Sequence, residues 1–139
     1  MTTPLAGFPI DHIGIAVHDL EAAAKIYQSA FGGVVDEPQT IASQKVRLTF
    51  ITLPNTKIEL LAPIDGGGTL QKFLDARGSG LHHICYRVDD IVGELKALEK
   101  LGHKLIDKSP RPGAHNSQIA FLHPATFEGV LIELCQLPK

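Results

Sequence analysis

The chain has 139 residues, a formal net charge of −2 and 44% hydrophobic residues, which is enough for one domain with an apolar core or two small fused modules. Its near-neutral charge argues against general binding of nucleic acid or of a membrane surface, both of which need a large basic excess. It has no apolar run of bilayer-spanning length and no N-terminal segment of signal-peptide type, so we expect a soluble, cytoplasmic protein.

The first half of the chain has the pattern of a strand, a helix and about three further strands. A β-rich run, HIGIAV, begins at His12, and Asp19 follows it in the position of a helix N-cap. Helical spacing of apolar residues then continues to Gly32, which is placed to end the helix. These apolar residues are Leu20, Ala23, Ala24, Tyr27 and Phe31. The runs VRLTFITL and KIELLAP complete this half as strands.

A glycine-rich linker, residues 64–79, follows the first half. Thr69 is placed to cap a short helix that carries Leu70, Phe73 and Leu74. The GGG run lacks the Lys-Ser/Thr pair that a phosphate loop needs, so we expect a connection rather than a nucleotide site.

The second half repeats the pattern of the first. The run HICYRV begins at His83, Asp90 is the expected N-cap, and a second helix ends at Gly102. Its apolar positions are Ile91, Leu95, Leu98 and Leu101. The strand-like runs QIAFLHP and VLIELCQL follow. Cys85 and Cys135 form no CxxC motif, so we expect two buried, reduced thiols rather than a disulfide framework or a zinc knuckle.

The two halves align residue by residue. At an offset of 71 residues, His12 falls on His83 and Asp19 on Asp90. Further matches at this offset are Ile13 with Ile84, Val17 with Val88, and Lys25 with Lys96. At an offset of 74, Ile58-Glu59-Leu60 falls on Ile132-Glu133-Leu134, with the three extra residues assigned to a longer turn at 124–129. We therefore predict two tandem βαβββ modules, at about residues 9–63 and 80–137.

This repeat places one histidine on the first strand and one glutamate on the last strand of each module. The four residues are His12, Glu59, His83 and Glu133. Two imidazoles and two carboxylates suit a divalent transition metal, with coordination positions left for substrate or water. A single strand histidine or glutamate is more often structural. Four at matching positions favour a metal site, because a carboxylate buried in an apolar strand is costly unless a cation compensates it.

His82 and His83 compete for the ligand position. Adjacent strand residues face opposite sides of a sheet, so one of the two is expected to point into the site. His83 aligns with His12, whereas His82 aligns with Asp11. We therefore assign His83.

Five segments together resemble the vicinal oxygen chelate (glyoxalase/bleomycin resistance) superfamily and, within it, the methylmalonyl-CoA epimerase family. They are DHIGIAV, NTKIELLAP, GLHHICYRVDDI, RPGAH and FLHPATFEGVLIEL, and they span nearly the whole chain. The HP followed by GVLIEL is more similar to the epimerases than to glyoxalase I, whose members resemble DPDGxxIEL there. The resemblance implies one α+β domain, residues 1–139, in which the two modules form a curved mixed sheet around a metal-binding cleft.

The resemblance also implies an activity, the epimerisation of (R)- and (S)-methylmalonyl-CoA by metal-assisted removal and return of the α-proton through an enolate. The implied cofactor is a divalent metal, cobalt first, with nickel, manganese, zinc or magnesium as alternatives. The implied partners are a coenzyme A thioester and a second copy of the chain in a homodimer. Two bases on opposite faces are the simplest machinery. We assign Glu133 as a ligand that also moves protons, with Glu59 second.

One segment departs from the family pattern. Members can carry a non-ligand glutamate around the strand that here reads ASQKVRLTF, where this chain has Ser43, Gln44 and Leu48. No carboxylate occurs between Glu37 and Glu59. Either the ligand glutamates act as bases, or Glu37 reaches in from its loop, or a bound water relays the proton.

Substrate-binding residues are expected in two places. Gln44 could hydrogen-bond the substrate carboxylate, or it could be a solvated strand-end residue. The segment HKLIDKSPRPGAH carries Lys104, Lys108 and Arg111 and could face the coenzyme A phosphates, or it could be a solvated loop.

Two other functions remain open. One is a glyoxalase I-type lactoylglutathione lyase, whose bacterial forms resemble this ligand set. The other is a non-catalytic small-molecule binding protein of the same superfamily, such as an antibiotic-sequestering protein. That binder is disfavoured because such proteins can dispense with metal ligands, and all four are present here.

Overall fold

The computed structural model describes residues 3–139, which fall into two compact units. The first unit is His12–His82, and the second combines the residues up to Asp11 with His83–Lys139. Each unit contains a mixed sheet and follows the strand-helix-strand order predicted from the sequence, which confirms the α+β class and the tandem βαβββ modules. Within residues 3–139, no helix has the length and apolar character needed to cross a membrane.

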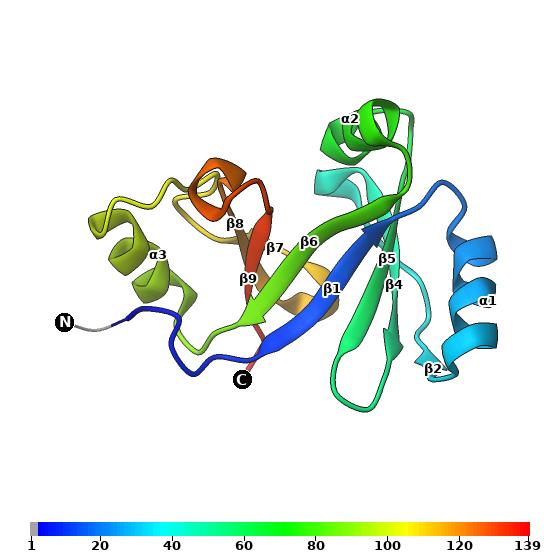
Figure 1. Ribbon diagram of the computed structural model, residues 1–139, viewed down its shortest axis with the longest axis horizontal. Helices are drawn as coiled ribbons and strands as arrows, with labels where there is room; N and C mark the ends of the chain where they lie inside the picture. The colour runs from blue at the N-terminus through cyan, green and yellow to red at the C-terminus, as the bar shows by residue number, and fades with distance from the viewer. Residues whose placement is uncertain (1–2) are drawn as a thin grey trace. The chain divides into compact units, whose positions relative to one another are not determined.

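The first unit is built around a sheet in which two long neighbouring strands run parallel (Figure 1). Its elements are β1 (Ile10–Ala16, which starts in the second unit), α1 (Leu20–Phe31), β2 (Val34–Val35), β3 (Gln39–Ile41), η1 (Ala42–Gln44), β4 (Val46–Thr52), β5 (Lys57–Pro63) and α2 (Gly68–Arg77). Strand β1 is parallel to β5, and β4 pairs antiparallel with β5, β2 and β3.

The second unit repeats this arrangement. Its elements are β6 (Gly80–Arg87, which starts in the first unit), α3 (Ile91–Lys100), β7 (Arg111–Pro112), η2 (Ala114–Asn116), β8 (Gln118–Leu122), η3 (Pro124–Phe127) and β9 (Ile132–Gln136). Strand β6 is parallel to β9, while β8 pairs antiparallel with β9 and β7. The turn η3 lies where the three extra residues of the second half were expected.

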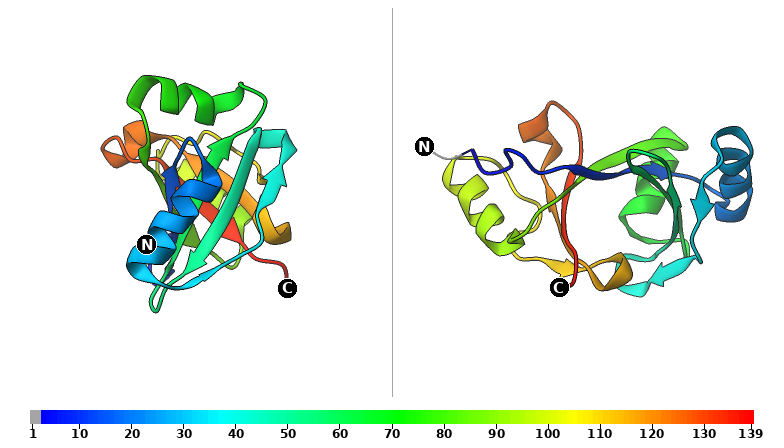
Figure 2. Two further views of the ribbon diagram at one scale, coloured as in Figure 1. Left: turned by 90° about the vertical axis from the view of Figure 1, so that its right-hand side faces the viewer. Right: turned by 90° about the horizontal axis from the view of Figure 1, so that it is seen from below.

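One helix covers one face of each sheet, as the views of Figure 2 show for α1 and α3. In the first unit, this face packs into a core with α1 that includes Leu20, Ile51 and Leu60. In the second unit, the core with α3 includes Leu95, Leu122 and Leu134. Because side chains alternate along a strand, the residues between these core positions point to the opposite face of the sheet. We call that opposite face, which carries the predicted ligands Glu59 and Glu133, the site face of each unit.

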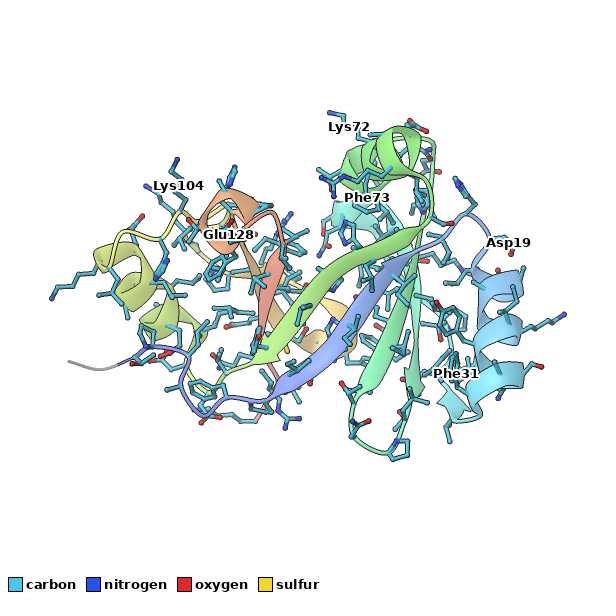
Figure 3. All side chains as sticks on the ribbon, viewed as in Figure 1. Asp19, Phe31, Lys72, Phe73, Lys104 and Glu128 are labelled. Carbon is cyan, nitrogen blue, oxygen red and sulfur yellow. The ribbon has the colours of Figure 1, made fainter. Side chains whose placement is uncertain are left out.

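Both predicted aspartate caps are present. Oδ1 of Asp19 accepts a hydrogen bond from the Ala22 backbone N–H at 3.1 Å, at the start of α1 (Figure 3). Oδ1 of Asp90 accepts one from the Gly93 N–H at 3.1 Å, at the start of α3. These bonds satisfy backbone donors that have no partner inside the helix.

The prediction that Thr69 caps the linker helix is wrong. Helix α2 begins at Gly68, and Gly67 occupies the N-cap position without a side-chain hydrogen bond. The start of the helix passes close to Lys45: a Cβ atom on Gly68 would lie 3.2 Å from the Lys45 Cβ, and φ of Gly68 is 88°. The contact with Lys45 and the positive φ of Gly68 both favour glycine there, so helix α2 begins at the glycines and not at Thr69. Leu70 and Leu74 are buried, as expected of the apolar side of this helix.

The first turn of α3 generates a stability prediction. A Cβ atom on Gly93 would lie 2.3 Å from Oδ2 of Asp90, so Gly93→Ala must displace the capping carboxylate. Replacing a helical glycine by alanine gains about 1 kcal/mol, and losing an aspartate cap costs about 1 kcal/mol. We expect Gly93→Ala to leave the free energy of unfolding nearly unchanged in the wild-type protein and to raise it by about 1 kcal/mol in Asp90→Ala. Urea unfolding of the four proteins measures this cycle, and equal effects in both backgrounds would contradict it.

Candidate metal-binding and reaction site

The first unit brings an imidazole and a carboxylate together on neighbouring strands. Nε2 of His12 on β1 lies 3.3 Å from Oε1 of Glu59 on β5, and each side chain is 6% exposed. The register places Glu59 opposite Gly14, two residues beyond His12 on the same face. The carboxylate and the imidazole thus lie side by side on one face of the sheet.

The second unit repeats this pair. Nε2 of His83 on β6 lies 3.2 Å from Oε1 of Glu133 on β9, and both side chains are buried. The register places Glu133 opposite Cys85, two residues beyond His83. Gly14 and Cys85 are separated by the same offset of 71 as the histidines, so the sequence repeat is confirmed at the level of strand register. Each unit thus offers one imidazole and one carboxylate that could hold a metal ion.

His82 takes the other direction, as expected from the alternation along β6. Its ring meets Phe73 of α2 edge to face, with the ring centroids 4.9 Å apart (Phe73 is labelled in Figure 3). His83, and not His82, therefore lies beside Glu133. The role of His83 as a metal ligand stays a prediction.

A phenylalanine flanks each His–Glu pair, which the sequence analysis missed. Phe50 lies opposite Glu59 in the β4–β5 register, and its ring meets His12 at 5.1 Å and 79°. Phe121 lies opposite Glu133 in the β8–β9 register, and its ring meets His83 at 6.0 Å and 88°. The offset of 71 also relates Phe50 to Phe121, so the repeat itself could have identified both. Each imidazole therefore has an aromatic ring packed against it.

A cation lies over each of these rings. Nζ of Lys57 is 5.4 Å from the centroid of Phe50, and the guanidinium of Arg111 is 5.2 Å from the centroid of Phe121. Nη2 of Arg111 also lies 3.2 Å from Oδ2 of Asp107, the same oxygen that accepts the Phe121 backbone N–H at 2.9 Å. The sequence signal for Arg111 was only its basic segment, and nothing in the spacing indicated Asp107.

The two predicted lysines of that segment lie differently. Lys108 faces Glu99 at 3.4 Å in an exposed pair, and Lys104 is exposed and projects away from the fold (Figure 3). Of the three basic residues assigned to phosphate binding, Arg111 is the one placed over the ring beside a His–Glu pair.

The segment around β4, where members of the family can carry a non-ligand glutamate, has no carboxylate in this chain. Ser43 is exposed and Gln44 half-buried in the turn η1, and Leu48 is buried on β4. Glu37 is exposed between β2 and β3. None of Ser43, Gln44 and Leu48 has a carboxylate. The contact of Gln44 with the substrate and the identity of any additional base stay predictions.

Both cysteines are reduced and buried on the site face of the second unit, as predicted. Burial raises the pKa of the Cys85 thiol well above its ordinary value, and a hydrogen bond with Cys135 and the negative charge of Glu133 raise it further. The two thiols therefore act as small apolar side chains beside the His83–Glu133 pair.

Comparison with known proteins places this arrangement in a family. Residues 11–121 match the model of the Glyoxalase/Bleomycin resistance protein/Dioxygenase superfamily. The chain belongs to this superfamily. It is 44% identical to the ethylmalonyl-CoA/methylmalonyl-CoA epimerase of Cereibacter sphaeroides, over 92% of this chain and 97% of that protein.

Solved structures agree with this relationship. The crystal structure of methylmalonyl-CoA epimerase from Mycobacterium tuberculosis matches with a TM-score of 0.90 and 34% identity, covering 100% of this chain and 93% of that one. A methylmalonyl-CoA epimerase in complex with methylmalonyl-CoA and NH4+ matches with a TM-score of 0.89 and 32% identity, covering 94% of each chain. The resemblance inferred from the five sequence segments is confirmed.

The environment of Cys85 predicts slow thiol chemistry. Because burial hinders access and the raised pKa leaves little thiolate at about pH 8, we expect neither thiol of the native protein to react rapidly with a disulfide reagent such as Ellman's reagent. Both should react at once in concentrated guanidinium chloride. Cys135→Ala isolates Cys85 as a control, and rapid stoichiometric labelling of this folded variant would contradict the prediction.

Proposed function

We propose that the chain catalyses the epimerisation of methylmalonyl-CoA, interconverting its (R) and (S) forms by removing and returning the α-proton. The observation that carries this proposal is the doubled His–Glu pair at equivalent register in two repeated units. The predicted enzyme class is confirmed by the epimerase of Cereibacter sphaeroides and by the epimerase structures. These relatives favour an epimerase over a glyoxalase I-type lyase or a non-catalytic binding protein.

We further propose that His12, Glu59, His83 and Glu133 together bind one divalent metal ion. The imidazole nitrogen and the carboxylate oxygen lie 3.3 Å apart in one pair and 3.2 Å apart in the other, so one cation could be held by both atoms of a pair. The burial of both carboxylates also favours a cationic partner, since a buried charge needs compensation. Cobalt is the first candidate, with nickel, manganese, zinc and magnesium as alternatives.

Two bases on opposite faces of the α-carbon are the simplest machinery for this chemistry. When bound, the metal ion supplies Lewis-acid stabilisation for the charge that develops as the proton leaves. We assign the main proton transfer to the Glu133 carboxylate and the transfer on the opposite face to Glu59. Phe50 and Phe121, the register partners of the two carboxylates, place an apolar ring beside each pair.

We also propose contacts with the coenzyme A thioester. The candidate residues are Gln44, Lys104, Lys108 and Arg111. We also retain a single domain formed by both modules, a homodimer and a cytoplasmic location.

Hydrogen exchange tests the activity directly. We expect the metal-loaded protein, incubated with each epimer of methylmalonyl-CoA in deuterated water, to exchange the α-proton and interconvert the epimers, as followed by NMR. We expect no exchange with the hemithioacetal of glutathione and methylglyoxal. The opposite substrate preference would establish the lyase instead, and binding without exchange would favour a non-catalytic role.

The same assay tests the bases. Glu133→Gln keeps an amide oxygen that can coordinate but cannot accept the proton at neutral pH, so exchange should fall by about a hundredfold or more. Glu59→Gln should be milder. Wild-type exchange by Glu133→Gln with full metal content would exclude Glu133 as an essential base and turn attention to Glu37 or a relayed water.

Metal analysis separates the two adjacent histidines. We expect wild-type protein to contain about one divalent metal per chain and His83→Ala to lose it, because His83 is the imidazole beside Glu133. His82→Ala is the matched control, since its ring packs against Phe73, and it should retain the metal. Mass spectrometry of the protein after dialysis provides the measurement, and the reverse result would exclude the proposed ligand set.

A further inference from the structure

Arg111 is held in a fixed position on the site face of the second unit. Its guanidinium stacks over Phe121, and Nη2 contacts the Asp107 carboxylate, which is itself tied to β8 through the Phe121 N–H. The backbone of Arg111 pairs with Ile119 in the β7–β8 ladder. A long cationic side chain held from two sides has lost much of its rotamer entropy before any ligand arrives, so it is preorganised for binding.

The guanidinium keeps donors for a ligand. The ion pair with Asp107 engages Nη2, whereas an arginine carries five N–H donors. Within residues 3–139, the Nε atom of Arg111 is buried and makes no hydrogen bond to another residue. Burial closes Nε to an incoming ligand, but the side chain is 41% exposed, so an anion can approach the outer edge of the guanidinium, which its two Nη atoms form.

The neighbours of Arg111 indicate which anion it meets. The Phe121 ring contacts both the Arg111 guanidinium and the His83 imidazole, and Phe121 is the register partner of Glu133. Arg111 is therefore a neighbour of the residues proposed to act at the α-carbon. The phosphates of coenzyme A are separated from the acyl group by the whole pantetheine arm, whereas the free carboxylate of a malonyl group is attached to the reacting carbon itself.

We propose that Arg111 binds the free carboxylate of the methylmalonyl group and thereby selects acyl-CoA substrates that carry one. Asp107 is a positioning residue, which orients the guanidinium without touching substrate. This inference rests on the proposed epimerase function and changes the assignment of Arg111 from a phosphate contact to a carboxylate contact. In the first unit, the cation over Phe50 is Lys57 of β5, which is not the repeat equivalent of Arg111, and an ammonium lacks the planar fork that binds a carboxylate with two parallel bonds.

Binding of two ligands that differ in one carboxylate tests the assignment. Isothermal titration of the metal-loaded protein measures Kd for methylmalonyl-CoA and for propionyl-CoA, the same thioester without the carboxylate. We expect Arg111→Gln to weaken methylmalonyl-CoA binding about tenfold or more and to leave propionyl-CoA binding unchanged, because a hydrogen bond between charged groups is lost for one ligand only. Arg111→Lys, which keeps the charge, should show a smaller loss with the same selectivity.

Asp107→Asn tests the positioning role. The amide oxygen can still accept the Phe121 N–H, but the charge that orients Arg111 is removed. We expect a selective loss for methylmalonyl-CoA that is smaller than the loss in Arg111→Gln. Lys96→Gln is the charge-matched control, since Lys96 is exposed on α3, which packs on the other face of the sheet, and it should not change the ratio of the two Kd values. Melting temperature and metal content confirm that each variant is folded and loaded.

Two results with Arg111→Gln would overturn the proposal. Equally weaker binding of methylmalonyl-CoA and propionyl-CoA would place Arg111 at the phosphates, and unchanged binding of both would exclude any contact with the substrate. Failure of the proposed function is seen in the wild-type protein instead, as an absence of exchange and of any preference for methylmalonyl-CoA over propionyl-CoA. If Arg111→Gln does not fold, the ratio measured in Arg111→Lys decides.

Discussion

The burial of Glu59 and Glu133 is the constraint on which each unit depends. Each carboxylate lies in a strand whose neighbouring residues are apolar, where an uncompensated charge costs several kcal/mol. In both units the imidazole that meets the carboxylate comes from the adjacent parallel strand, two residues before the register partner of the glutamate. A slip of one residue in β5 or β9 would turn the carboxylate into the helix-facing core, so this pairing fixes the register of the central strands.

The alternation of side chains along each strand gives the two faces of each sheet different compositions. One face is apolar and packs against α1 or α3, and this packing carries the hydrophobic stabilisation. The other face can then hold buried polar groups, which lie beside Phe50 and Phe121. Rigid strands, rather than loops, therefore hold the four side chains that we assign to the metal, which suits a site that must keep its geometry through a proton transfer.

Local patterns in the sequence predicted the features that local physics decides. The strand and helix periodicities, the caps at Asp19 and Asp90 and the pairing of His83 rather than His82 with Glu133 follow from spacing within one element or between the repeats. The Thr69 cap failed because a tertiary contact with Lys45 fixes the start of α2. The ion pair of Arg111 with Asp107 could not be predicted either, because it depends on the path of an irregular segment. Phe50 and Phe121, in contrast, could have been predicted from the repeat.

The two halves of the repeat share their His–Glu pairs but differ in the cation beside each pair, and both properties suit epimerisation. Proton transfer on two faces of one carbon is simplest with two similar bases, and the two that we propose, Glu59 and Glu133, have equivalent register and each lies beside its own imidazole. The substrate, however, carries a thioester on one side of that carbon and a carboxylate on the other, so a fully symmetric site could not hold it in a single orientation. The halves differ where this matters: a lysine lies over one phenylalanine, and an arginine oriented by an aspartate lies over the other. On this proposal, duplication accounts for the paired bases, and the unlike cations over Phe50 and Phe121, which come from non-equivalent positions of the repeat, set the direction in which the substrate binds.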